Sequence, residues 1–121
     1  MGFLNYKDLD VFNECKELVK NVYSISKNFP NEEIYCLTNQ IRRASISIIS
    51  NIAEGTGRNY TKDSLQFFYI SRGSLFEVEA QLLIAKDLNY ISEEQLENIL
   101  LQCTTCKKLL NGFINYHKSK L

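Results

Sequence analysis

Apolar residues recur at three- and four-residue steps along most of the chain, the spacing that aligns side chains on one face of an α-helix. The first such stretch predicts a helix over residues 7–28, whose other side carries lysine, glutamate, asparagine and serine. Further stretches predict helices over residues 32–54, 62–88 and 93–117. No segment alternates strictly between apolar and polar residues, so we expect no half-buried β-strand.

Short joints with turn-forming and capping residues separate the four predicted helices. Asn31 is placed to cap the second helix, and the Gly-Thr-Gly sequence at 55–57 predicts its end. Thr61 is the expected cap of the third helix. Ser92 and Gln95 have the spacing of a capping box at the start of the fourth helix.

Short joints force consecutive helices to lie antiparallel. We therefore predict an all-α fold, an antiparallel up-down-up-down four-helix bundle, as a single domain over residues 1–121. The first six residues lack the pattern of a signal peptide, and no apolar run approaches the roughly 18 residues of a membrane span. We expect a cytoplasmic protein with no membrane association, in which the cysteines are reduced.

The two middle helices have more apolar surface than one core stripe requires. The second helix carries Ile46, Ile49 and Ala53 almost opposite its main apolar face. A second apolar face on the third helix comprises Leu65, Tyr69, Phe76, Ala80 and Leu83. Such a face commonly packs against another chain, so we expect a homo-oligomer. The alternative is that the joints or chain ends cover this surface.

Charge excludes one class of function and leaves another open. The chain has 14 Lys or Arg and 14 Asp or Glu, a formal net charge of +0, which excludes coating of nucleic acid through overall positive charge. This argument does not apply to a local basic patch, because phosphate contacts need only a few basic side chains.

The candidates for RNA or DNA contact are Arg42, Arg43, Arg58 and Arg72, accompanied by Lys62 and by Tyr60 and Tyr69 as stacking surfaces. A second basic cluster comprises Lys107, Lys108, Lys118 and Lys120. The alternative for both sets is a solvated surface with ion pairs.

Catalytic and metal-binding patterns are weak. Cys103 and Cys106 form a C-x-x-C spacing inside a predicted helix rather than at its N-terminus, so we interpret them as small buried apolar residues. His117 is the one histidine and lies near the predicted end of the last helix. The carboxylates beside apolar helix surface, Glu54, Glu77 and Glu79, are expected to form ion pairs with Arg43 and Arg72. We therefore expect no enzyme, cofactor or metal site.

Two longer motifs carry a family resemblance. Residues 40–55, QIRRASISIISNIAEG, and residues 68–75, FYISRGSL, followed by Glu77, resemble the signatures of four-helix-bundle proteins encoded in intervening sequences of bacterial 23S ribosomal RNA genes. The chain departs from that family at Ile49, where proline is usual, and at Phe76, where a small residue is common.

The resemblance implies a left-handed bundle that assembles as a homopentamer. It also implies kinship with accessory variability determinant proteins of diversity-generating retroelements, which bind nucleic acid and a reverse transcriptase. It carries over no catalytic residue. A nucleic-acid enzyme such as a reverse transcriptase is thus a possible partner besides a second copy of the chain.

The signature residues have a physical interpretation. We expect polar residues of the two middle helices to fix register or subunit contacts, with Gly73 allowing close helix approach. These candidates for the structural signature or the oligomer interface are Ile46, Ile49, Asn51, Glu54, Tyr69, Gly73, Phe76 and Glu77. The predicted function is a non-enzymatic homo-oligomeric module that binds RNA or DNA or assists assembly, with five weak basic patches acting by avidity. The alternative is a protein-interaction scaffold that does not bind nucleic acid.

Overall fold

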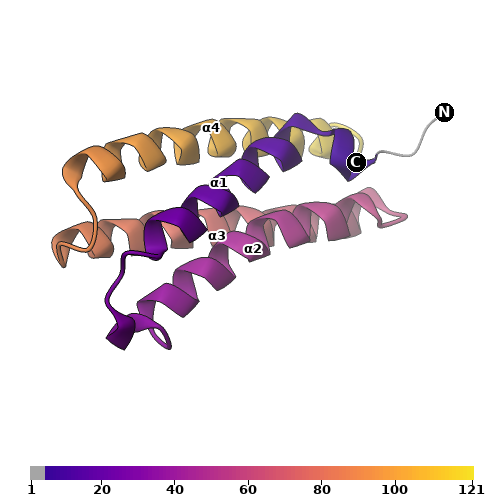
Figure 1. Ribbon diagram of the computed structural model, residues 1–121. Coiled ribbons are helices and arrows are strands. Elements are labelled where there is room, and N and C mark those ends of the chain that lie inside the picture. The colour runs from indigo at the N-terminus through magenta and orange to yellow at the C-terminus, as the bar shows by residue number, and fades with distance from the viewer. Residues whose placement is uncertain (1–4) are drawn as a thin grey trace.

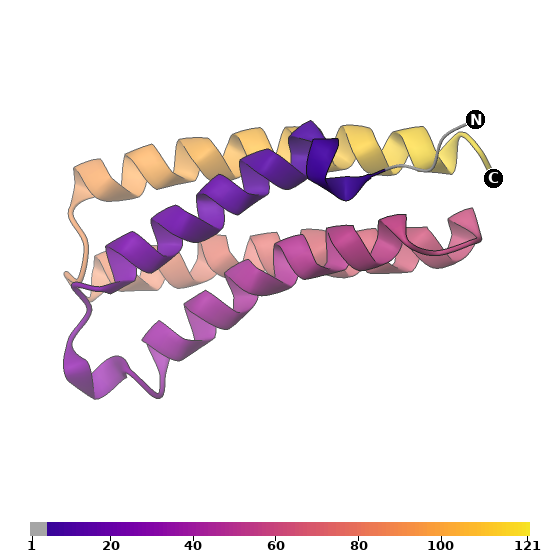
Figure 2. The same ribbon diagram turned by 45° about the vertical axis from the view of Figure 1, so that its right-hand side comes forward.

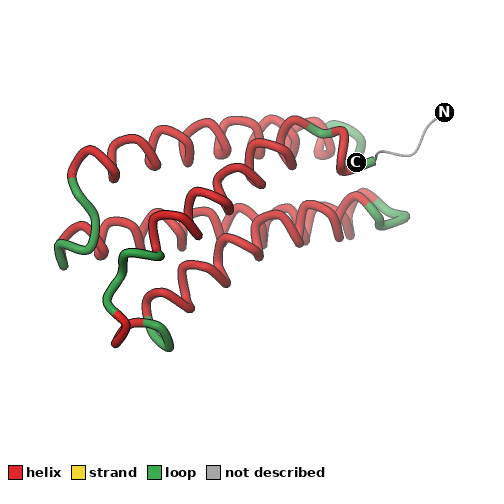
Figure 3. The backbone as a smooth tube through the Cα atoms, in the orientation of Figure 1, coloured by secondary structure: helices red, strands yellow, loops and turns green. Residues whose placement is uncertain are grey.

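The helices lie where the sequence pattern predicts them. A computed structural model describes residues 5–121; the expectation that the chain carries no signal peptide rests partly on residues 1–4, which lie outside that range. The four long helices are α1 (Asp10–Ser26), α2 (Leu37–Thr56), α3 (Thr61–Asp87) and α4 (Glu93–Lys118). Single 3₁₀ turns precede the first two of them, η1 (Tyr6–Asp8) and η2 (Asn31–Glu33). Helices and loops make up the whole described chain (Figure 3), which confirms the all-α prediction.

The helices alternate in direction. Figure 1 shows the α1–α2 and α3–α4 joints at one end of the bundle, and the α2–α3 turn with the start of α1 and the end of α4 at the other. Figure 2 shows the same order, with the α1–α2 joint projecting at the edge of the bundle. Each helix packs against two neighbours, α2 and α3 most extensively, and within residues 5–121 the backbones of diagonally opposed helices stay apart. The predicted up-down-up-down four-helix bundle is therefore confirmed.

One apolar core runs through the bundle. The predicted stripes of α1 and α4 face inward, and Leu18, Phe68 and Leu110 are completely buried. Burying a side chain of this size contributes about 1.5–3 kcal/mol. Phe68 also packs against Phe113, with ring centroids 4.8 Å apart. None of the helices in the described part of the chain combines the length and apolar character needed to cross a membrane.

Small residues bring α2 and α3 together. Ser71 Oγ on α3 donates to the carbonyl oxygen of Ile48 on α2 at 2.7 Å. Ser74 and Ser47 join the two helices through their hydroxyl oxygens at 2.8 Å. Asn51 extends this network, because its Nδ2 donates to the backbone carbonyl oxygen of Ser47 at 2.8 Å and to Ser47 Oγ at 3.0 Å. The signature residue Asn51 thus belongs to a polar network within the chain.

Glycine is required at one position of this seam. A Cβ on Gly55 would lie 2.8 Å from Phe68 Cδ1 and closer still to Phe68 Cε1. The predicted role of Gly73 is wrong within the bundle, because a Cβ there would meet no atom within 4 Å. Close helix approach therefore depends on Gly55, whereas Gly73 lies exposed on α3.

Two of the three predicted caps differ from the structure. Ser92 Oγ accepts from the Gln95 backbone N–H at 3.1 Å and Gln95 Oε1 from the Ser92 N–H at 2.8 Å, which confirms the capping box. Asn31 opens η2 instead of capping α2, whose first residue Leu37 donates its N–H to a Glu33 carboxylate oxygen at 3.2 Å. Thr61 is the first residue of α3 rather than its cap. Glu33 also accepts from Tyr90 Oη at 2.7 Å, which ties the two joints of this end together.

Candidate functional site

The four candidate arginines do not form one patch. Arg42 lies between α2 and α1: its Nε donates to Ser26 Oγ at 2.8 Å, and its guanidinium carbon is 4.9 Å from the centroid of the Tyr23 ring. Arg43 is the next residue of α2 and is exposed. Arg58 follows α2 by two residues and lies 15 positions after Arg43. At 1.5 Å per residue this separation is about 20 Å.

Arg58 and Arg72 are occupied by contacts elsewhere on the bundle. Arg58 Nη2 pairs with a Glu54 carboxylate oxygen at 2.9 Å, and its guanidinium lies 4.4 Å from the centroid of Phe67. Arg72 faces α4, where its Nη1 donates to Asn111 Oδ1 at 3.2 Å. Because α3–α4 and α1–α2 are opposite sides of the bundle, Arg72 cannot share a site with Arg42 in one chain. Only Arg42 and Arg43 remain together.

The predicted pairing of the carboxylates is wrong in its partners. Glu54 pairs with Arg58, its neighbour one helical turn onward, rather than with Arg43. Glu79 on α3 pairs with Lys107 on α4 at 2.8 Å, and both side chains are largely buried. Glu77 is exposed and takes part in none of the ion pairs found among residues 5–121. The Glu79–Lys107 pair holds α3 and α4 in register, and none of the ion pairs among residues 5–121 joins two carboxylates as an acid–base pair.

Three of the four cysteines and the histidine are buried. Cys15, Cys103 and Cys106 are buried, as predicted for the C-x-x-C pair, whereas Cys36 is exposed. Hydrogen bonding with Cys15, followed by burial, raises the pKa of Cys106. No group of three or more potential metal ligands occurs in the part of the chain that the structure describes. His117 is only 7% exposed. The helix α4 continues through this residue, and His117 Nδ1 lies 2.9 Å from the carbonyl oxygen of Phe113.

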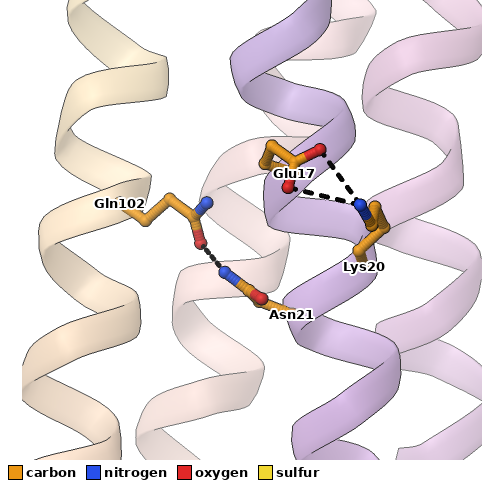
Figure 4. A network of polar contacts seen from close by, with 4 residues as sticks. All are labelled: Glu17, Lys20, Asn21 and Gln102. Carbon is orange, nitrogen blue, oxygen red and sulfur yellow. Dashed lines mark hydrogen bonds and ion pairs between the residues drawn. The ribbon is translucent and has the colours of Figure 1, made fainter.

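A polar hollow lies between α1 and α4. Asn21 Nδ2 donates to Gln102 Oε1 at 2.7 Å across these helices, beside the Glu17–Lys20 ion pair on α1 (Figure 4). The hollow has a volume of about 260 Å³ and is lined by Asn21, Ser24, Ile25, Asn28, Gln95, Asn98, Ile99 and Gln102. Its lining has no ionisable side chain and therefore no general acid or base.

The outward side of α3 is largely apolar, although the exposed Gln66 and Glu77 also lie on it. We call it the α3 face and define it by Tyr69, Ile70, Gly73, Phe76, Ala80, Leu83 and Ile84. Ile70, Phe76 and Leu83 each expose half or more of their side-chain surface. The predicted second face of this helix is thus confirmed except at Leu65, which is buried. Ile70 and Ile84 extend this face beyond the predicted residues, and Leu101 of α4 is a further exposed apolar residue, with 68% of its surface exposed.

The second face of α2 is largely covered. Ile49 and Ala53 are half-buried, and Ile49 packs against the apolar core. Ile46 remains 40% exposed beside Arg42. For α2, therefore, the rest of the chain covers much of the surface that the sequence assigned to another subunit, and α3 carries the larger uncovered face.

Known proteins share both the sequence pattern and the fold. The family described as 23S rRNA-intervening sequence protein matches residues 7–112. A crystal structure of a protein of unknown function from the S23 ribosomal protein family of Bacteroides thetaiotaomicron is 28% identical, with a TM-score of 0.79. The similarity covers 86% of this chain and 97% of that one. No curated protein matches the chain.

Proposed function

Since the chain belongs to the family of 23S rRNA-intervening sequence proteins, we propose that it is a non-enzymatic helical-bundle module that assembles with copies of itself. The observation that carries this proposal is the α3 face, where apolar side chains from Tyr69 to Ile84 lie on the outside of a bundle whose core is already filled. Contiguous exposed apolar patches on soluble proteins mark sites of interaction.

The composition of the α3 face favours packing against another helix. Tyr69, Gly73, Phe76, Ala80 and Leu83 follow one another at steps of four and three residues, the spacing of a coiled-coil seam. Large and small side chains alternate along this seam, so that a large residue of one chain has space over a small residue of another. Zero net charge adds no overall repulsion between identical copies.

A closed ring is built from heterologous contacts, in which the α3 face of one chain packs against a different surface of the next chain. Five subunits is the number that the family resemblance implies, and we adopt it for the proposed assembly. The rings of Tyr69 and Phe76 lie beside Arg72 and Lys107, with Arg72 5.3 Å from the first ring centroid and Lys107 5.4 Å from the second. A polar rim of this kind around apolar residues is the usual anatomy of a protein interface.

A second candidate function is binding of RNA or DNA. Arg42 and Arg43 support it, since these two adjacent arginines lie at one hollow and neither has a carboxylate partner among residues 5–121. A nucleic-acid enzyme such as a reverse transcriptase would be a further partner of the same assembly. A scaffold that binds only protein is the alternative, and it needs the α3 face alone.

Sedimentation of two charge variants tests the assembly. Leu83→Asp places a carboxylate on the α3 face and is expected to yield monomers, because a buried unpaired charge is strongly unfavourable. Tyr35→Asp is the matched control, since Tyr35 is an exposed apolar residue outside that face, 88% exposed in the α1–α2 joint. The proposal predicts that the control sediments like the unmodified chain. Equal sedimentation of all three proteins would contradict it.

A further inference from the structure

Arg42 is held in place by neutral partners. Its Nε donates to Ser26 Oγ at 2.8 Å, and its Nη2 donates to the Tyr23 carbonyl oxygen at 3.4 Å. The ring of Tyr23 packs against the same guanidinium. A guanidinium has five N–H donors, so this arrangement fixes the group while leaving donors unused.

No ion pair among the described residues balances the positive charge at this position. Arg42 is half-buried, Arg43 is exposed beside it, and the ion pairs found among residues 5–121 include neither residue. Lys27, the residue directly after α1, follows Tyr23 by four positions and adds a further positive charge. A half-buried cation without a counter-ion costs free energy, which an anion supplied from outside would recover.

The two arginines share one hollow. It has a volume of about 470 Å³ and is lined by Tyr23, Asn39, Arg42, Arg43, Ile46 and Ser47. The lining contains guanidinium, amide and hydroxyl donors and no carboxylate. The hollow at the end of α2 differs in this respect, because Glu54 lines it together with Arg58 and neutralises that arginine.

We propose that the hollow formed by Arg42, Arg43, Asn39 and Ser47 is a phosphate-binding site. Arg42, fixed by Ser26, presents its remaining N–H groups as a positioned donor, and the exposed Arg43 closes on the same phosphate. Guanidinium groups suit this ligand, since their planar forks match two phosphate oxygens at once. The phosphate belongs either to the backbone of a single-stranded RNA or to a small phosphate monoester. The inference rests on the second function proposed above and assigns it to two of the four candidate arginines.

Site-resolved titration tests the assignment directly. The Nε–H resonances of the ¹⁵N-labelled chain are followed while inorganic phosphate, uridine monophosphate or a decamer of uridylate is added. The signals of Arg42 and Arg43 are expected to shift and those of Arg58 and Arg72 to stay in place. Parallel anisotropy measurements give the affinity for the labelled decamer between about 50 and 200 mM salt.

Two variants separate the site from overall charge. Arg43→Gln is the test variant, since Arg43 is exposed and its loss leaves the Arg42–Ser26 contact intact. It is expected to weaken decamer binding by about tenfold or more and to reduce the salt slope by about 1. Arg58→Gln removes the same charge outside the hollow and outside the α3 face, and is expected to change the affinity by less than about twofold.

Each outcome decides a different point. Shifts with the decamer, alone or with the monoesters, support the site with a backbone phosphate as ligand. Shifts with the monoesters but not the decamer support the site with a small phosphate as ligand and remove the RNA function. Decamer binding that Arg43→Gln and Arg58→Gln weaken equally overturns the site while RNA binding stands. No shift of Arg42 or Arg43 with any of the three probes overturns the proposal.

Discussion

The Ser71 hydroxyl on α3 donates a hydrogen bond of 2.7 Å to the carbonyl oxygen of Ile48 on α2, at a point where Ser71 is completely buried. Ile48 is also completely buried, so no water replaces either partner. This contact lies in the seam where α2 and α3 pack most extensively. The seam fixes the orientation of α3 and therefore of its outward face.

Replacing Ser71 tests the contribution of this contact. Ser71→Ala is expected to lower the free energy of unfolding by about 1 kcal/mol, the usual net contribution of a hydrogen bond. Ser71→Val adds volume to a tight seam and is expected to cost about 1–3 kcal/mol. Urea titration followed by circular dichroism measures both changes. Ser50→Ala is the control, since Ser50 is an exposed serine of α2, and an equal loss there would contradict the account.

Gly55 provides a second test of the same seam. Gly55→Ala is expected to lower the melting temperature, because the added Cβ would collide with the Phe68 ring and overpacking costs about 1–3 kcal/mol. Gly112→Ala is the matched control on α4, where a Cβ meets no atom within 4 Å. There the substitution is expected to stabilise by about 1 kcal/mol through helix propensity. Equal effects of the two substitutions would show that α2 and α3 are less tightly packed than described.

The four thiols are expected to differ sharply in reactivity. Burial, and then the nearby Glu79 carboxylate, raises the pKa of Cys103 to about 12, so its reactive thiolate is scarce at pH 8. An aromatic disulfide reagent is expected to modify the exposed Cys36 rapidly and the three buried thiols only after unfolding. Cys36→Ser should abolish the rapid phase. Rapid reaction of a second thiol in the folded protein would contradict the buried arrangement.

Alkaline pH is expected to weaken the tie between the two joints. The hydrogen bond to Glu33, followed by desolvation, raises the pKa of Tyr90 from 10.0 to about 12. Above pH 10 the unfolded chain releases this proton while the folded chain retains it, so the contribution is complete below pH 10 and is lost as the pH rises toward 12. Comparing the unfolding free energy of the unmodified chain with that of Tyr90→Phe isolates the effect. A difference that stays constant from pH 9 to pH 12 would argue against it.

Local sequence signals predict the helices well because each signal acts within a few residues. Periodic apolar positions place all four helices, and the Ser92–Gln95 box marks a true helix start. Asn31 fails as a cap because an additional turn, η2, intervenes before α2. Local sequence spacing does not reveal that turn, which includes Glu33, a residue that accepts a hydrogen bond from Tyr90, 57 positions later in the chain.

Contacts between helices are harder to predict. The sequence alone groups Arg42 and Arg72 in one candidate patch, yet Arg42 turns toward α1 and Arg72 toward α4. Glu79 finds Lys107, whose side chain also lies near the ring of Phe76. The position of a residue along a helix gives the face on which its side chain lies. It does not say which neighbouring helix that face meets. The same limitation applies to Ile49. Its helical spacing predicts a subunit contact, whereas in the structure it packs against the core of the bundle.

Light scattering on the purified chain tests the central claim, self-assembly through the α3 face, most directly. One chain has a mass of 14.0 kDa, so an assembly of five is expected to have a mass of about 70 kDa at micromolar concentration. Phe76→Asp, which charges an exposed position of the α3 face without touching the core, is expected to give the mass of one chain. A mass of 14.0 kDa for the unmodified chain across the accessible concentration range would contradict the account.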